Sequence, residues 1–215
     1  MPVEQKKLFI FDLDGTLVDA YPAIIRSFNF TMKKMGYPVV SRDEIIRAVG
    51  WGDTDLIRPF VRRQDLARAL RVYRKHHAES LRKNIRLMPH AKSLLLCLKS
   101  QGIKTAIATN RPSRFTRIIL RRLKIDVLFD KVLCADKLDF AKPHPLILNT
   151  LLKMFHLARV HAVYVGDMAL DVETGRRAGI DTIAVATGSS RLQELKKAKP
   201  ARLFKDLKQL MGYCG

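Results

Sequence analysis

Residues 8–17 read LFIFDLDGTL, a short apolar run that stops abruptly at acidic residues and a glycine. The run at 8–11 is too short for a helix and has the composition of a buried strand. Asp12, Asp14 and Gly15 follow at once, and these residue types favour a sharp turn. The stretch therefore predicts a buried strand whose carboxyl end carries two carboxylates, separated by a single residue.

Further short apolar runs follow along the chain, separated by stretches with apolar residues at helical spacing. Strands that alternate with helices predict a parallel sheet with helices on both faces, a Rossmann-like α/β fold. In such a sheet a ligand binds outside the carboxyl ends of the strands, so functional residues are expected there. The expected strands are 8–11, 104–108, 162–165 and 182–186, with a weaker candidate at 131–134, and the expected helices are 91–100, 113–123, 145–155 and 170–178.

Residues 18–83 interrupt this alternation. From about residue 19 onward they carry helical periodicity and many charges, but no convincing strand. We therefore predict a helical cap domain at 18–83, inserted after the first strand, and a Rossmann-like core domain formed by 1–17 together with 84–215.

The composition of the 215-residue chain excludes several classes of protein. Hydrophobic residues make up 47% and charged residues 28%, which is too many core-forming side chains for a disordered chain. No apolar run reaches the ~18 residues that a membrane-spanning helix needs. Cys97, Cys134 and Cys214 lie far apart, which argues against a disulfide framework and a structural zinc site and favours a reducing, cytoplasmic location.

The chain carries 40 Lys and Arg against 20 Asp and Glu, a formal net charge of +20. Such a surplus suits a nucleic acid, an anionic membrane or a small anionic substrate as partner. Basic residues are densest at 58–83 and 111–124, but at 111–124 they form a stripe opposite apolar positions, as on any surface helix. We therefore favour a solvated basic face. We expect no membrane partner, and nucleic acid stays an open, less favoured alternative.

Asp12 and Asp14 are the first candidates for catalysis. Two carboxylates so close repel each other, so one takes up a proton unless a cation or a hydrogen-bond donor compensates the charge. A carboxylate at a strand end can also attack phosphorus and form an aspartyl-phosphate, while a second one protonates the leaving oxygen. The alternative is a pair of turn-forming acids with no part in catalysis.

Polar residues also follow the later strands. Thr109 and Asn110 precede a helix, where a hydroxyl, an amide and free backbone N–H groups either bind an anion or simply cap the helix. Lys142 is followed by two prolines, which would hold its ammonium group on a stiff turn. Asp167 and Asp171 lie four residues apart in GDMALD and offer the hard oxygen ligands that suit magnesium.

In this order, the four motifs resemble those of the haloacid dehalogenase superfamily, in particular its phosphoglycolate-phosphatase-like branch with a small helical cap. The resemblance covers residues 8–188, and four motifs in order are far more specific than any one of them. It implies a magnesium-dependent phosphatase that hydrolyses a small phosphorylated metabolite, similar to phosphoglycolate, through an aspartyl-phosphate. The motifs are DLDGT at 12–16, Thr-Asn at 109–110, Lys-Pro at 142–143 and GDMALD at 166–171.

The resemblance also implies roles for individual residues. Asp12 is expected to be the nucleophile and Asp14 the general acid and base. Lys142 is expected to neutralise the nucleophile and the phosphoryl group, and Thr109 and Asn110 to bind phosphate oxygens. The expected Mg²⁺ ligands are Asp12, Asp14 through its backbone carbonyl, Asp167, and Asp171 in a supporting or water-bridged position.

Two alternatives to the phosphatase remain at this stage. A sugar-phosphate mutase of the same superfamily is the nearer one, although Thr16 after Gly15 is more typical of the phosphatases. An inactive core whose basic surface binds RNA or another polyanion is less favoured, because all four motifs are intact. Dehalogenation is not expected, since Asp14 supplies an acid that a halide leaving group does not need.

Two further residues depart from common patterns. Trp51, the only tryptophan, lies between Gly50 and Gly52 where related caps lower a specificity loop over the active site. A lone tryptophan more often packs inside a core, so a substrate contact is the less favoured of its two interpretations. His90 occupies a position that the family often fills with glycine, and we interpret it as a surface residue.

Overall fold

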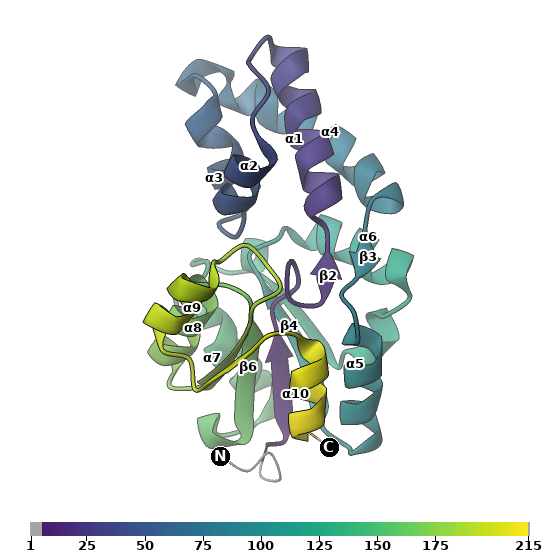
Figure 1. The fold of residues 1–215 in the computed structure, drawn as a ribbon, viewed down its shortest axis with the longest axis vertical. Helices are drawn as coiled ribbons and strands as arrows, with labels where there is room; N and C mark the ends of the chain where they lie inside the picture. The colour runs from purple at the N-terminus through teal and green to yellow at the C-terminus, as the bar shows by residue number, and fades with distance from the viewer. Residues whose placement is uncertain (1–5, 215) are drawn as a thin grey trace.

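A computed structural model describes residues 6–214, except for the side chains of Tyr213 and Cys214. Its centre is a six-stranded sheet in the order β5-β4-β1-β6-β7-β8, and every neighbouring pair is parallel. The sheet lies in the lower part of the molecule in Figure 1. The strands are β1 (Leu8–Phe11), β4 (Lys104–Thr109), β5 (Lys131–Cys134), β6 (Ala162–Gly166), β7 (Asp181–Val185) and β8 (Arg202–Phe204).

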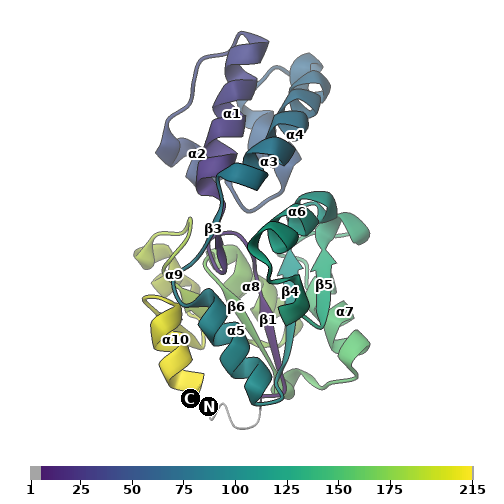
Figure 2. The ribbon, with the colours of Figure 1, turned by 90° about the vertical axis from the view of Figure 1, so that its right-hand side faces the viewer.

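Helices cover both faces of this sheet. They are α5 (Ala91–Ser100), α6 (Ser113–Leu123), α7 (Leu146–Phe155), α8 (Ala169–Ala178), α9 (Leu192–Ala198) and α10 (Leu207–Cys214). In β1, Phe9 and Phe11 pack on the side of α5, α6 and α10, whereas Leu8 and Ile10 pack against α7 on the opposite side. Figure 2 shows α5 and α10 side by side on the first face. The predicted Rossmann-like α/β class is confirmed.

The predicted elements of the core agree closely with the observed ones. The strands at 8–11 and 131–134 and the helices at 91–100 and 113–123 have the predicted bounds, and the others differ by one residue at one or both ends. The edge strand β8 was not predicted. It has only three residues and is partly exposed, so it carries no apolar run in the sequence.

A separate layer of four α-helices lies above the carboxyl edge of the sheet (Figure 1). They are α1 (Tyr21–Met35), α2 (Arg42–Ala48), α3 (Asp53–Ile57) and α4 (Leu66–Lys83). α1 and α4 pack together and bury Phe28, Met32 and Tyr73. The antiparallel pair β2 (Val18–Asp19) and β3 (Arg86–Leu87) joins this layer to the core. The division into a cap at 18–83 and a core made of the rest remains our proposal.

The turn after β1 holds Asp14 above the edge of the sheet. Gly15 has a φ of 82°, in the left-handed region that glycine adopts without strain. A Cβ at this position would overlap the hydroxyl of Tyr21 and lie 2.6 Å from Asp167 Oδ2. Glycine is therefore required by the backbone conformation and by the close approach of two side chains.

Smaller expectations concern His90, the cysteines and membrane insertion. His90 is exposed and directly precedes α5 with a φ of 66°, a conformation that suits glycine, and its interpretation as a surface residue agrees with this exposure. Cys97 and Cys134 are free, whereas the thiol of Cys214 lies outside the described side chains. Within residues 6–214, no helix combines the length and apolar composition that a membrane span requires.

Gly175 provides a test of how α8 packs on β7. A Cβ at Gly175 would overlap Thr182 Oγ1 and lie 3.0 Å from the carbonyl oxygen of Ile180. We predict that Gly175→Ala lowers the free energy of unfolding by about 1–3 kcal/mol in urea denaturation, because overpacking outweighs the better helix propensity of alanine. The control is Gly212→Ala in α10, where no described residue comes within 4 Å of the added Cβ. It should leave stability unchanged or slightly raised, and equal behaviour of the two variants would contradict the packing.

Candidate active site

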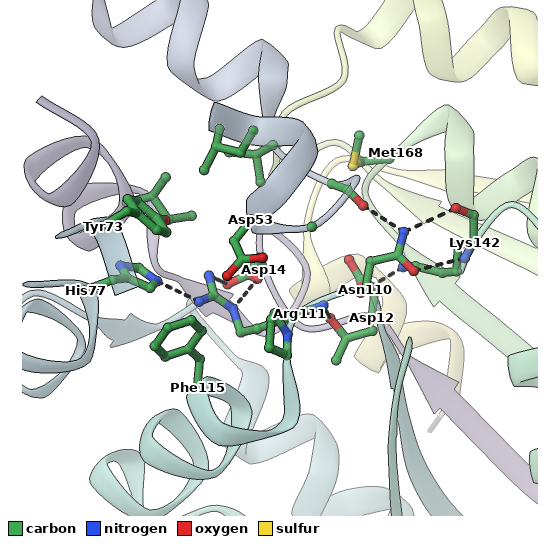
Figure 3. Close-up of a pocket in the computed structure, with 17 residues that line it drawn as sticks. Asp12, Asp14, Asp53, Tyr73, His77, Asn110, Arg111, Phe115, Lys142 and Met168 are labelled. Carbon is green, nitrogen blue, oxygen red and sulfur yellow. Dashed lines mark hydrogen bonds and ion pairs between the residues drawn. The ribbon is translucent and has the colours of Figure 1, made fainter. Parts of the chain in front are cut away.

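Polar side chains converge where the central strands end below the cap. Asp12 follows β1, Thr109 ends β4 and Asp167 follows β6, and these three strands are neighbours in the sheet. Lys142 reaches the same place from the loop before α7. A cavity lies between this edge and the cap (Figure 3). Its polar lining includes Asp12, Asp14, Arg111 and Lys142 from the core and Asp53, Tyr73 and His77 from the cap.

The ammonium group of Lys142 is buried and directs all three of its N–H donors into the site. Its Nζ lies 2.9 Å from Asp12 Oδ1, 2.7 Å from Asp171 Oδ1 and 2.9 Å from the hydroxyl oxygen of Tyr164. Burial alone would lower the pKa of Lys142, but the charges of the two aspartates raise it above its ordinary value. Lys142 is therefore charged and fixes one oxygen of Asp12.

The carboxylate of Asp171 is largely occupied by protein donors. Besides Lys142, it accepts hydrogen bonds from the Tyr164 hydroxyl at 2.7 Å and from the backbone N–H of Met168 at 3.0 Å. These bonds orient the carboxylate toward Lys142. A supporting or water-bridged position of Asp171 beside a metal ion stays a prediction.

Asp12, Asp167 and Asp171 form a buried cluster that fits a divalent cation. One carboxylate oxygen of each residue lies within 4.8 Å of the others. The three carboxylates outnumber the ammonium group of Lys142 by two charges, and carboxylate oxygens are the ligands that hard divalent cations prefer. The buried hydroxyl group of Tyr21 lies close to Asp167 and Ser189 in the same part of the site.

Burial, together with the charges of neighbouring carboxylates, raises the pKa values of Asp12 and Asp167. Burial raises the pKa of Asp12 to about 6, with an opposing contribution from Lys142 and a further increase from Asp171. Burial and the charges of the other two aspartates raise the pKa of Asp167 well above its ordinary range. Both groups would be ionised more readily with a cation between them.

The carboxylate of Asp14 forms its ion pair with Arg111, not with the Lys142 of this cluster. Arg111 donates from Nε to Asp14 Oδ2 at 2.6 Å and from Nη2 to Oδ1 at 2.9 Å, and the two side chains are only 7% and 12% exposed. Such a two-pronged bond fixes both oxygens of the carboxylate. The interpretation of 111–124 as a wholly solvated basic face is therefore wrong for its first residue, although Arg114 and Arg117 are exposed as expected.

The predicted phosphate ligands differ in how they are bonded. Thr109 Oγ1 accepts a hydrogen bond from the backbone N–H of Arg111 at 3.1 Å, which leaves the hydroxyl proton able to donate to a bound anion. Asn110 donates from Nδ2 to the carbonyl oxygens of Gly50 and Lys142 and accepts from the Lys142 N–H. Its side chain thus ties the lysine loop to the cap, and its contact with phosphate remains a prediction.

The cap reaches the cavity through the loop around Gly50 and Gly52. Both glycines and Asp53 line the cavity, and Asp53 is held by Arg74 at 2.7 Å. Trp51 is 48% exposed and lines a neighbouring hollow rather than the cavity. Its contact with substrate therefore stays a prediction that this arrangement does not support.

Several residues of the site were not predicted from the sequence. Arg111 directly follows the Thr-Asn pair at a strand end, and this position was a usable signal. Tyr73 and His77 come from the middle of α4, and Phe115 from α6, where their apolar or helical surroundings gave no sign of a cavity.

The parallel sheet carries an acidic cluster at its carboxyl edge, with a buried lysine beside the first aspartate and a helical layer above. Together these features define a hydrolase-like site. The family model described as haloacid dehalogenase-like hydrolase matches residues 9–185, and the chain therefore belongs to this family. A protein named phosphoglycolate phosphatase from Colwellia psychrerythraea is 29% identical over 98% of both chains. One of the same name from Aliivibrio fischeri is 29% identical over 97% of this chain and 96% of its own.

Solved structures agree with these relatives. A protein from Haemophilus somnus 129PT, described as a predicted phosphoglycolate phosphatase, superposes with a TM-score of 0.94 at 28% identity, covering 98% of this chain and 99% of its own. The family and its fold are thereby established for this chain, as the resemblance of the motifs predicted.

The acidic cluster predicts how a divalent cation affects stability. A cation bound only to the folded state should raise the melting temperature, and the rise grows with the logarithm of one plus the ratio of the free cation concentration to its dissociation constant. Because the pKa of Asp12 is about 6, a proton occupies this carboxylate below that pH and competes with the cation. We predict that the dissociation constant for Mg²⁺ or Mn²⁺, measured by thermal shift, rises at least about tenfold between pH 7.5 and pH 5.

The matched variants are Asp167→Asn and Asp126→Asn. Asp126 is exposed and takes no part in the cluster, so its variant should respond to the cation like the parent. Asp167→Asn should lose most of the cation-dependent stabilisation. A response that is equal in both variants would place the cation elsewhere.

Proposed function

We propose that the protein is a magnesium-dependent phosphatase that hydrolyses a small phosphorylated metabolite through an aspartyl-phosphate on Asp12. The observation that carries this proposal is the buried contact of Asp12 with Lys142 beside a carboxylate cluster that fits a divalent cation. A carboxylate next to a fixed ammonium group can meet a phosphate dianion without prohibitive repulsion.

In the first step, an oxygen of Asp12 attacks phosphorus and the bond from phosphorus to the leaving oxygen breaks. Lys142 holds Asp12 Oδ1 at 2.9 Å, so the same ammonium group orients the nucleophile and offsets negative charge on the phosphoryl group. The hydroxyl of Thr109 donates to a phosphate oxygen. Asp14 gives its proton to the leaving oxygen, which departs as an alcohol.

In the second step, water attacks the phosphorus of the aspartyl-phosphate. Asp14 now takes a proton from this water, the bond from Asp12 to phosphorus breaks, and inorganic phosphate and free Asp12 are released. The proton that Asp14 gives up in the first step is thus returned to it in the second. Arg111 holds the Asp14 carboxylate in position for both transfers.

The proposed Mg²⁺ ligands are Asp12, the backbone carbonyl of Asp14, and Asp167, with Asp171 in a supporting position. When bound, Mg²⁺ supplies positive charge where negative charge accumulates on the phosphoryl oxygens. The donor set of carboxylate and carbonyl oxygens is the one that magnesium prefers.

The cavity favours a small substrate. Apolar side chains from both layers, among them Ile24, Leu56 and Phe115, close it around the polar groups. Because relatives that cover nearly the whole chain are named phosphoglycolate phosphatase, we propose phosphoglycolate as the first substrate to test. A mutase and a nucleic-acid partner stay the less favoured alternatives, and a cytoplasmic location stays a prediction from the cysteines.

The proposal predicts the outcome of a phosphate-release assay. Phosphoglycolate, sugar phosphates and an aryl phosphate are supplied with and without Mg²⁺. We predict Mg²⁺-dependent release of phosphate with phosphoglycolate among the best substrates, and a loss of at least ~10³-fold in Asp12→Asn, because the amide cannot act as the nucleophile.

Asp126→Asn is the control, since this exposed carboxylate lies outside the cavity. It should keep the activity of the parent. Transfer of phosphate between two positions of a sugar, without release, would establish a mutase instead, and undiminished release in Asp12→Asn would refute the proposed nucleophile.

A further inference from the structure

A hydrogen-bonded chain leads from Asp14 into the middle of the cap (Figure 3). Besides its two bonds to Asp14, Arg111 places Nη1 2.8 Å from Nε2 of His77, a residue of α4. His77 Nδ1 in turn lies 3.2 Å from Ser27 Oγ on α1. The chain therefore crosses from the core to two helices of the cap, and it exists only while the cap lies against the core.

The hydrogen bonds of Ser27 determine which nitrogen of His77 carries the proton. Ser27 has one hydroxyl proton and donates it to the carbonyl oxygen of Ala23 at 2.7 Å. It must then accept from His77 Nδ1, and likewise from Nδ1 of His76 at 3.1 Å. His77 Nε2 is consequently free of a proton and accepts from Arg111, whose guanidinium group can only donate.

The surroundings of His77 keep it neutral and fixed. Its side chain is 1% exposed, stacks on Tyr73 with ring centres 4.9 Å apart and meets the edge of Phe115 at 5.0 Å. Burial and the neighbouring charge of Arg111 lower the pKa of His77 well below its ordinary value, with a smaller contribution from Arg114 and an opposing one from the Ala23 carbonyl. The imidazole therefore presents a lone pair, not a second positive charge, to Arg111.

We propose that His77 is a positioning residue, which accepts a hydrogen bond from Arg111 and thereby holds the guanidinium group in register with Asp14 when the cap is closed. The proposal rests on the role of Asp14 as general acid and base in the proposed function. The alignment of Asp14 then depends on the position of α4 against the core. Phosphate hydrolysis therefore reaches its full rate only when the cap is closed.

Arg111 needs an acceptor on His77 because of the geometry of its guanidinium group. The guanidinium fork is planar, so its two bonds to Asp14 and its bond to His77 share one plane and one orientation. Without an acceptor at the position of His77 Nε2, a buried N–H of Arg111 lacks a partner, and the group rotates to find one. The carboxylate of Asp14 then moves with it, away from the leaving oxygen.

The test compares His77→Gln with His77→Asn. The amide of glutamine reaches the position of Nε2 and can still accept from Arg111, whereas that of asparagine reaches only the position of Nδ1. We predict that His77→Asn lowers kcat for phosphate release about 10- to 100-fold, with KM changed less than about threefold, because Asp14 is misplaced and substrate binding is not. His77→Gln should recover most of this loss.

His76→Asn is the matched control, because His76 bonds the same Ser27 but stacks on Phe30 and does not contact Arg111. It should leave kcat within about twofold of the parent. A larger KM at unchanged kcat in His77→Asn would make Arg111 a substrate ligand and overturn the proposal. So would equal losses in the Gln and Asn variants, since the acceptor would then be irrelevant.

Nitrogen-15 NMR of the histidine rings in the unmodified protein gives a readout that needs neither activity nor a variant. We expect a proton on Nδ1 of His77 and a bare Nε2 throughout pH 6–8, and a proton on Nε2 would overturn the proposal. If the parent protein releases no phosphate while His77 shows the expected form, the proposed function fails. A chain that is active but has a protonated Nε2 contradicts only the role of His77.

Discussion

The buried ammonium group of Lys142 is the interaction on which the active site depends. The ends of β1 and β6 and the first turn of α8 bring three carboxylates within 4.8 Å of one another in the interior, where each charge would be costly without a partner. Lys142 contacts two of them, and Tyr164 completes its set of acceptors. Burial raises the pKa values of Asp12 and Asp167, and the neighbouring carboxylates raise them further. The remaining excess of negative charge accounts for the fit to a divalent cation.

The two aspartates of the first motif lie one residue apart but have separate cations. Asp12 contacts Lys142, which belongs to the core, whereas Asp14 is bound by Arg111, which also contacts the cap. This separation suits two different tasks, since a nucleophile needs a fixed position and an acid–base group needs to be aligned when the substrate is enclosed. The basic surface is distinct from this pair, because most of its side chains are exposed, and Arg111 is an exception within it.

The sequence predicts those site residues whose positions follow from neighbouring residues in the chain. It does not predict residues whose roles depend on contacts between distant parts of the chain. The strand before Asp12 and the positions of Thr109 and Lys142 follow from local signals, namely short apolar runs, turn residues and prolines. His77 does not, because its function arises from a contact with Arg111 across 34 positions, and nothing in the helical pattern of α4 marks it. The amide of Asn110 contacts the backbone of Gly50 and Lys142, a long-range contact that is visible only in the fold, and its contact with phosphate stays a prediction.

The central claim is that Asp12 becomes covalently phosphorylated, and trapping the intermediate tests it most directly. In Asp14→Asn the second step lacks its base, whereas an aryl phosphate with a good leaving group needs no proton in the first step. The aspartyl-phosphate should therefore accumulate after this variant is mixed with Mg²⁺ and an aryl phosphate labelled in its phosphate group and quenched in acid. The account predicts that the label lies on the peptide that contains Asp12 and is released by hydroxylamine. A label on another residue, or phosphate release from Asp14→Asn at the rate of the parent with no label on Asp12, would contradict it.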